Sequence, residues 1–117
     1  MRAVAIPADV RAQAEAALEE FCRKHSSAPG ADPLRFAYEI QANAALLSKQ
    51  RPGFMKPDQW VSSPVANFRY SQARNVWSLH WSDNNGRWHR VSNVKAEKDI
   101  NVLLQVVVTD PLGVFWS

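Results

Sequence analysis

Cysteine and glycine are both scarce in this chain of 117 residues, and each shortage excludes a class of protein. The one cysteine, Cys22, cannot form a disulfide within the chain, and it cannot supply the set of ligands that a zinc ribbon needs. The four glycines are scattered, so no segment has the glycine pattern that binds the phosphates of a nucleotide. A lone cysteine favours a reducing compartment, and we expect a cytoplasmic protein.

Long apolar segments and paired acids are also missing. No apolar run approaches the roughly 20 residues that a membrane-spanning helix needs. The start of the chain meets Pro7 and Asp9 too early for a signal peptide, so we expect no membrane association. No two carboxylates stand out as a general acid and base. The sequence therefore predicts no catalytic residue, no cofactor and no metal site.

The positive charge of the chain is concentrated in its middle. Residues 34–95 carry a net charge of +6, whereas residues 1–33 and 96–117 carry −1 and −2. This asymmetry says nothing about the fold, but it directs attention to anionic partners of the central segment.

The segment 76–91 organises the predicted fold. Two aromatic-rich alternating runs flank Asn85-Gly86, which is the strongest short-range signal for a β-hairpin. A turn of two or four residues places four large apolar side chains on one face and three other residues on the opposite face. The first set is Trp77, Leu79, Trp81 and Trp88, and the second is His80, His89 and Val91. A three-residue turn would instead align Trp81 with His89 and Val91. We predict a turn with an even number of residues (the even turn) and not a three-residue turn (the odd turn), because burying three tryptophans together outweighs burying a histidine.

Apolar spacing along the rest of the chain predicts an α+β fold in a single domain over residues 1–117. We expect an antiparallel meander of about five strands, with an N-terminal and a C-terminal helix packed on one face. The predicted helices cover 8–25 and 96–108, the strands cover 34–41, 45–51, 65–70, 76–82 and 87–91, and an aromatic tail covers 114–116. Residues 52–64 hold three prolines and are expected to be an irregular loop. The predicted core is Phe21, Phe36, Tyr38, Phe68, Trp77, Trp81, Trp88, Leu103 and Leu104.

Several short motifs resemble one family of small bacterial proteins, which is known as domain of unknown function 3024. The motifs are Arg51-Pro52, Ala66-x-Phe68-Arg69-Tyr70, Trp77-x-Leu79-x-Trp81, Arg87-Trp88 and Asp110-Pro111-x-Gly113-x-Phe115-Trp116. The chain departs from the family's usual pattern at Lys49, where members commonly carry an acid, and at Ser117, where they commonly end in glycine. The resemblance implies a bacterial single-domain protein and transfers no catalytic residue, because the family has no assigned activity.

The outer face of the predicted sheet is the best candidate for a functional surface. Strand alternation sends a set of basic side chains to that face, away from the apolar side. The candidate residues are Arg35, Lys49, Arg51, Arg69, His80 and His89. Such a face is typical of nucleic-acid or other polyanion binding, especially with Trp60 and Trp116 at its margins. It is equally typical of a protein interface or of ordinary polar surface. The alternative function is a small enzyme or a binding protein for an anionic small molecule in a sheet–loop pocket, and an unpaired edge strand would allow a homodimer.

Two smaller constellations favour a structural interpretation. His80 and His89 would face each other across the hairpin, but two imidazoles without a nearby carboxylate make a weak metal site. Cys22 precedes His25 by three residues, yet no third group is available to orient that histidine as a base. We expect a half-buried structural thiol at Cys22 and a helix-end histidine at His25.

Overall fold

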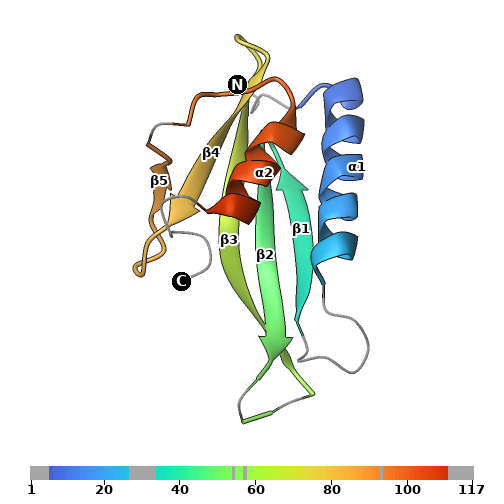
Figure 1. Cartoon of the computed structure of the whole chain (residues 1–117), viewed down its shortest axis with the longest axis vertical. Coiled ribbons are helices and arrows are strands. Elements are labelled where there is room, and N and C mark those ends of the chain that lie inside the picture. Colours follow the sequence, from blue (N-terminus) through green and yellow to red (C-terminus); the bar gives the residue numbers. More distant parts are fainter. Residues whose placement is uncertain (1–5, 27–33, 54, 57, 93, 111–117) are drawn as a thin grey trace.

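The computed structural model describes residues 6–26, 34–53, 55–56, 58–92 and 94–110. Its elements are α1 (Ala8–His25), β1 (Arg35–Gln41), β2 (Ala44–Pro52), β3 (Trp60–Ser71), β4 (Val76–Ser82), β5 (Trp88–Arg90) and α2 (Ile100–Thr109). The strands form one antiparallel sheet in the order β1-β2-β3-β4-β5, and both helices lie on the same side of it (Figure 1). The predicted α+β meander is thereby confirmed. No helix in the described ranges is long and apolar enough to cross a membrane.

Helix α1 has the bounds that its sequence predicts. Pro7 occupies the N-cap position, and Asp9 lies in the first turn, where a negative charge meets the positive end of the helix dipole. The buried side of the helix consists of Ala14, Ala17, Leu18 and Phe21. The Phe21 ring packs edge-on against the Phe36 ring of β1, with 5.7 Å between the centroids. The helical spacing of these residues therefore places α1 over β1.

Strands β2 and β3 are longer than the sequence predicts. Their pairing continues to Pro52 and Trp60, so part of the expected loop over 52–64 is strand, and that prediction is wrong for this part. A shift of register between Leu47 and Ser48 inserts Val65 as an extra residue next to Pro64. A bulge accommodates a proline, which has no N–H to donate to the ladder. The extended pair projects beyond the helices as a two-stranded ribbon (Figure 1).

Helix α2 begins at Ile100, four residues later than predicted. Glu97, which lies three residues before the helix, forms two backbone hydrogen bonds with Trp77, of 2.7 and 2.9 Å, and so continues the pairing along β4. Asp99 then caps the helix, since its side chain accepts a hydrogen bond from the Asn101 N–H. Strand-like pairing along β4 therefore delays the helix.

The core lies between the sheet and the two helices. Six of the predicted core residues are buried, namely Phe21, Phe36, Phe68, Trp77, Leu103 and Leu104. Tyr38 and Trp81 are half-buried at its edge. The core also contains Leu18, Leu47, Leu79, Val65, Val91 and Val107, none of which is more than 2% exposed. Trp88 lies outside this core, which contradicts its prediction.

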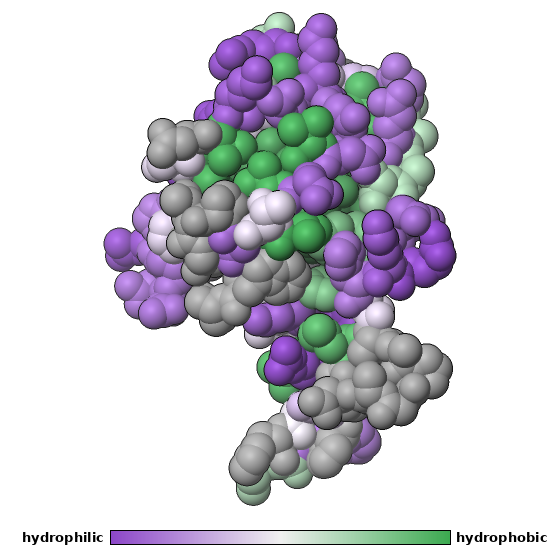
Figure 2. Space-filling view, in the orientation of Figure 1, coloured by the Kyte–Doolittle hydropathy of each residue, from purple (hydrophilic) through white to green (hydrophobic). Residues whose placement is uncertain are grey.

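The helix side of the molecule carries an apolar surface of its own. Figure 2 shows this side, on which hydrophobic side chains gather over α2. Val102 and Val108 belong to this surface and are 44% and 38% exposed. The aromatic tail predicted over 114–116 lies outside the described residues.

Candidate functional site

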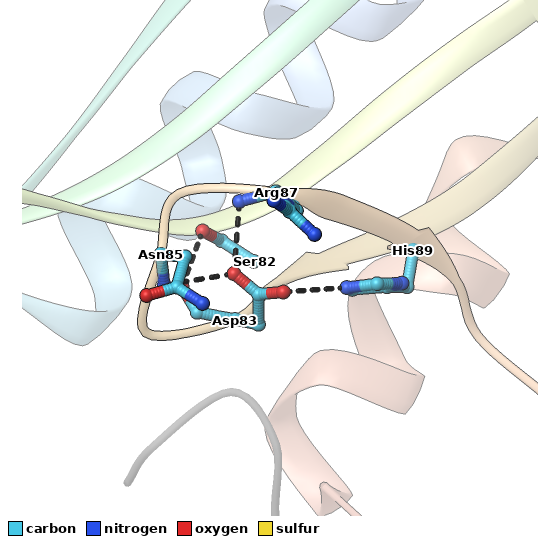
Figure 3. Close-up of polar contacts among 5 residues, drawn as sticks. All are labelled: Ser82, Asp83, Asn85, Arg87 and His89. Atoms are coloured by element: carbon cyan, nitrogen blue, oxygen red, sulfur yellow. Dashed lines mark hydrogen bonds and ion pairs between the residues drawn. The ribbon is translucent and has the colours of Figure 1, made fainter.

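The turn between β4 and β5 determines which side chains reach each face of the sheet. A backbone hydrogen bond from Asp83 N–H to the Arg87 carbonyl closes a connection over residues 84–86, and Gly86 adopts a φ of 79° there. One oxygen of the Asp83 carboxylate accepts hydrogen bonds from the N–H groups of Asn85 and Arg87, at 2.8 and 2.9 Å (Figure 3). The other oxygen lies 2.8 Å from Nε2 of His89. These contacts, above all the bond to His89, lower the pKa of Asp83, so the carboxylate is charged at neutral pH.

This three-residue turn reverses the predicted register of the hairpin. Trp81 is paired with His89, and Ser82 with Trp88. Val91 consequently joins the core, while Trp88 takes the opposite face. The prediction overlooked that Asp83 satisfies the turn N–H groups, and that His89 need not be buried. Its ring packs on the Trp81 ring at 4.8 Å and its side chain remains 45% exposed.

We call the face of the sheet that points away from the helices the outer face. One row of paired residues crosses it through all five strands, consisting of Glu39, Leu46, Asn67, His80 and Arg90. The next row contains Arg69 opposite Ser78. No described helix packs on this face, because α1 and α2 lie on the other side (Figure 1).

Arg69, Ser78, His80 and Arg90 form a compact group on the outer face, which we call the basic cluster. Nε2 of His80 lies 2.9 Å from the Ser78 hydroxyl oxygen. The Arg69 Nε donates a hydrogen bond of 3.2 Å to the Asn67 side chain. Within the described ranges neither arginine has a carboxylate partner. The one acid of the same row, Glu39, lies on β1, three strands away from His80.

The basic cluster has a positive electrostatic potential that acts on its own histidine. Partial burial is the main cause that lowers the pKa of His80 to about 4, and the charges of Arg69 and Arg90 lower it further. His80 is therefore neutral at pH 7, and its imidazole offers a hydrogen-bonding group without adding charge. An anion placed between the two arginines would meet fixed positive charge on an exposed surface.

The six predicted site residues do not all share this face. Arg35, Arg69 and His80 lie on the outer face, as predicted. Lys49 pairs with Phe36 and Arg51 with Val61, so both side chains belong to the helix side of the ribbon, and their predicted placement is wrong. His89 also lies on the helix side, next to Trp81, because of the odd turn.

The sequence interpretation missed Arg90 and Trp88 as residues of the outer face. Both were misplaced by the choice of an even turn. The signal for the odd turn was Val91, a β-branched apolar residue that the even turn would expose and the structure buries.

The structure argues against two alternatives considered from the sequence, a metal site at His80 and His89 and a nucleophilic thiol at Cys22. His80 and His89 lie on opposite faces and cannot share a metal ion, and no group of three potential ligands occurs in the described ranges. The pKa of Cys22 is raised to about 11, mainly by burial and also by the charge of Glu19. This thiol is therefore a poor nucleophile at neutral pH.

A cavity of about 570 Å³ lies between α1, the start of α2 and Trp77 of β4. Ala14, Ala17 and Ile100 give it apolar walls, and Lys98 and Glu20 lie at its polar parts. Its described lining contains no histidine, cysteine or serine, and its ionisable side chains are Glu20, Lys98 and Asp99. The cavity is also distant in sequence from the predicted sheet–loop pocket near residues 52–64.

Fold and surface together define a small α+β domain in which both described helices cover one sheet face and the other face carries the basic cluster. The motif residues Phe68, Trp77 and Leu79 lie in its core. The chain belongs to the family described as domain of unknown function (DUF3024), whose model matches residues 6–117. Comparisons with curated proteins and with solved structures give no match.

Proposed function

We propose that this protein is a binding module without catalytic activity, and that its outer face binds an anionic polymer, namely nucleic acid. The observation that carries the proposal is the basic cluster, in which Arg69 and Arg90 flank His80 with no acid in the group. Arginine guanidinium groups bind phosphate oxygens in a fork geometry, and the neutral His80 and Ser78 side chains add hydrogen-bonding groups between them.

The charge distribution of the whole chain supports this partner. The central segment 34–95 contributes the strands and carries the net charge of +6. Phosphate contacts of this kind supply most of the affinity for nucleic acid, and they attract the polymer at long range. We place the protein in the bacterial cytoplasm, as its lone Cys22 and its family resemblance suggest.

The test is a binding titration of the purified full chain at low and physiological salt. Fluorescence anisotropy with labelled single-stranded and duplex oligonucleotides, and competition with heparin, report polyanion binding directly. We expect saturable binding that weakens steeply with salt, since each phosphate contact contributes about −0.7 to −0.9 to the slope of log K against log salt. Size-exclusion chromatography of the same samples reports whether the protein is a dimer.

The variants separate the outer face from general charge. The double reversal Arg69→Glu/Arg90→Glu should weaken binding strongly at low salt, and the binding that remains should have a smaller salt slope. Lys49→Glu/Arg51→Glu changes the net charge by the same amount on the helix side of the ribbon and should retain most of the affinity. No polyanion binding at low salt would contradict the proposal, and the outer face would then have to be tested as a protein interface. Equal losses in both double variants would contradict the assignment to this face.

A further inference from the structure

Two tryptophans lie on the outer face, each close to an arginine. Trp60 begins β3, and the Arg35 guanidinium lies over its ring, 4.0 Å from the centroid. The position of Arg35 is fixed further by a hydrogen bond of 2.6 Å from its Nε to the Gln50 side chain. The Trp60 side chain nevertheless remains exposed, with 38% of its surface accessible. An exposed aromatic ring held by an arginine is a platform on which a flat ligand can stack.

Trp88 is the second aromatic residue of this face. It precedes Arg90 by two residues on β5, so both side chains point to the same side of the sheet. Its partner across the hairpin is Ser82, which places it next to the row of His80. β5 is the last strand of the sheet, and Trp88 is only half-buried there. The basic cluster therefore has an aromatic neighbour at the sheet edge.

The two tryptophans are separated by a distance that one extended strand of nucleic acid can follow. Trp88 lies level with Val65 of β3, five residues beyond Trp60, or roughly 16 Å along the strand. Crossing from β3 to β5 adds about 10 Å sideways, so the diagonal between the two rings is roughly 20 Å. Arg35 marks one end of this line and Arg90 the other.

We propose that the polymer bound by the outer face is single-stranded nucleic acid, with bases stacked on Trp60 and Trp88 and phosphates held by Arg35, Arg69 and Arg90. This inference rests on the proposed function and adds that the bound nucleic acid is single-stranded. In a duplex the bases stack on each other and are not free to stack on a protein ring. Five strands at about 4.8 Å spacing are also broader than the major groove, which is about 12 Å wide, so the face cannot enter it.

The experiment compares a single strand of about 12 nucleotides, its duplex with the complementary strand, and heparin, which has no bases. The three ligands are titrated at physiological salt into the full chain and into Trp60→Ala/Trp88→Ala. We expect the double variant to lose about 30-fold or more in affinity for the single strand, the lower limit for two lost stacking contacts. Its affinity for heparin should not change. The control Trp60→Phe/Trp88→Phe retains aromatic rings and should recover most of the single-strand affinity.

A second measurement on the unmodified protein avoids any doubt about the folding of the variants. In two-dimensional NMR spectra, the indole N–H signals of Trp60 and Trp88 should shift on addition of the single strand, while that of the buried Trp77 should not. Equal affinity for single strand, duplex and heparin, with no effect of the alanine variant, would overturn this inference and leave polyanion binding intact. Absence of binding to all three ligands would overturn both proposals.

Discussion

The titration of His80 tests the electrostatics of the outer face before any ligand is known. The folded protein lowers the pKa of His80 from 6.5 to about 4, because burial first, and then Arg69 and Arg90, disfavour the imidazolium. The unfolded chain therefore binds a proton at this residue between pH 6.5 and 4, where the folded chain does not. Stability contributed by the neutral histidine is present at neutral pH and falls as the pH decreases through this window.

The size of this loss of stability follows from the difference between the pKa of His80 in the folded chain and in the unfolded chain. The full difference in pKa corresponds to about 3 kcal/mol. Because the side chain is only half-buried, solvent screening reduces the expected loss of unfolding free energy to about 1–2 kcal/mol between pH 7 and pH 4. Chemical denaturation at a series of pH values measures it, and His80→Asn supplies the reference. The difference between the two proteins isolates His80 from the other groups that titrate in acid.

The arginines are then removed one at a time. Arg69→Gln and Arg90→Gln should each move the NMR titration midpoint of the His80 ring upward, by about one pH unit at most, because each change removes a partly screened charge that disfavours the imidazolium. Arg23→Gln, an exposed change on α1, removes the same charge far from the cluster and should leave the midpoint in place. A His80 ring that titrates near pH 6.5, or that ignores both arginines, would refute the positive potential assigned to the outer face.

Three further predictions concern the core, the turn and the thiol. Trp77→Ala should lower the free energy of unfolding by about 3–5 kcal/mol in chemical denaturation, and Trp81→Ala by clearly less, because Trp81 is half-buried; the reverse order would contradict the burial assigned to these two side chains. Asp83→Ala should lower the thermal midpoint at pH 7. The difference from the unmodified protein should shrink in acid, because protonation of the native carboxylate weakens the hydrogen bonds that lower the pKa of Asp83; a difference independent of pH would contradict a charged carboxylate in the turn. Cys22 should react with iodoacetamide at pH 7 far more slowly in the folded than in the unfolded protein, as its pKa of about 11 requires, and equal rates would contradict its burial.

Local patterns were sufficient for the elements that local interactions decide. Helical spacing predicts both ends of α1, and the strand predicted over 34–41 matches β1 within one residue. The boundaries that failed depend on pairing between distant segments. Strand β3 extends back to Trp60 because β2 continues to pair with it, and α2 starts late because Glu97 pairs with Trp77. Neither pairing has a signal in the segment that it reshapes.

The same limit applies with more effect to the candidate site, because one residue in a turn decides its composition. With an even turn, Trp88 would face the core, and His89 would stand beside His80 on the outer face. With the turn that Asp83 stabilises, Arg90 stands opposite His80 instead, and Trp88 joins the same surface. A weak pair of histidines is thus replaced by an arginine cluster with an adjacent aromatic ring. The basic charge of the central segment was visible in the sequence, but its arrangement into a site depended on hydrogen bonds in a three-residue turn.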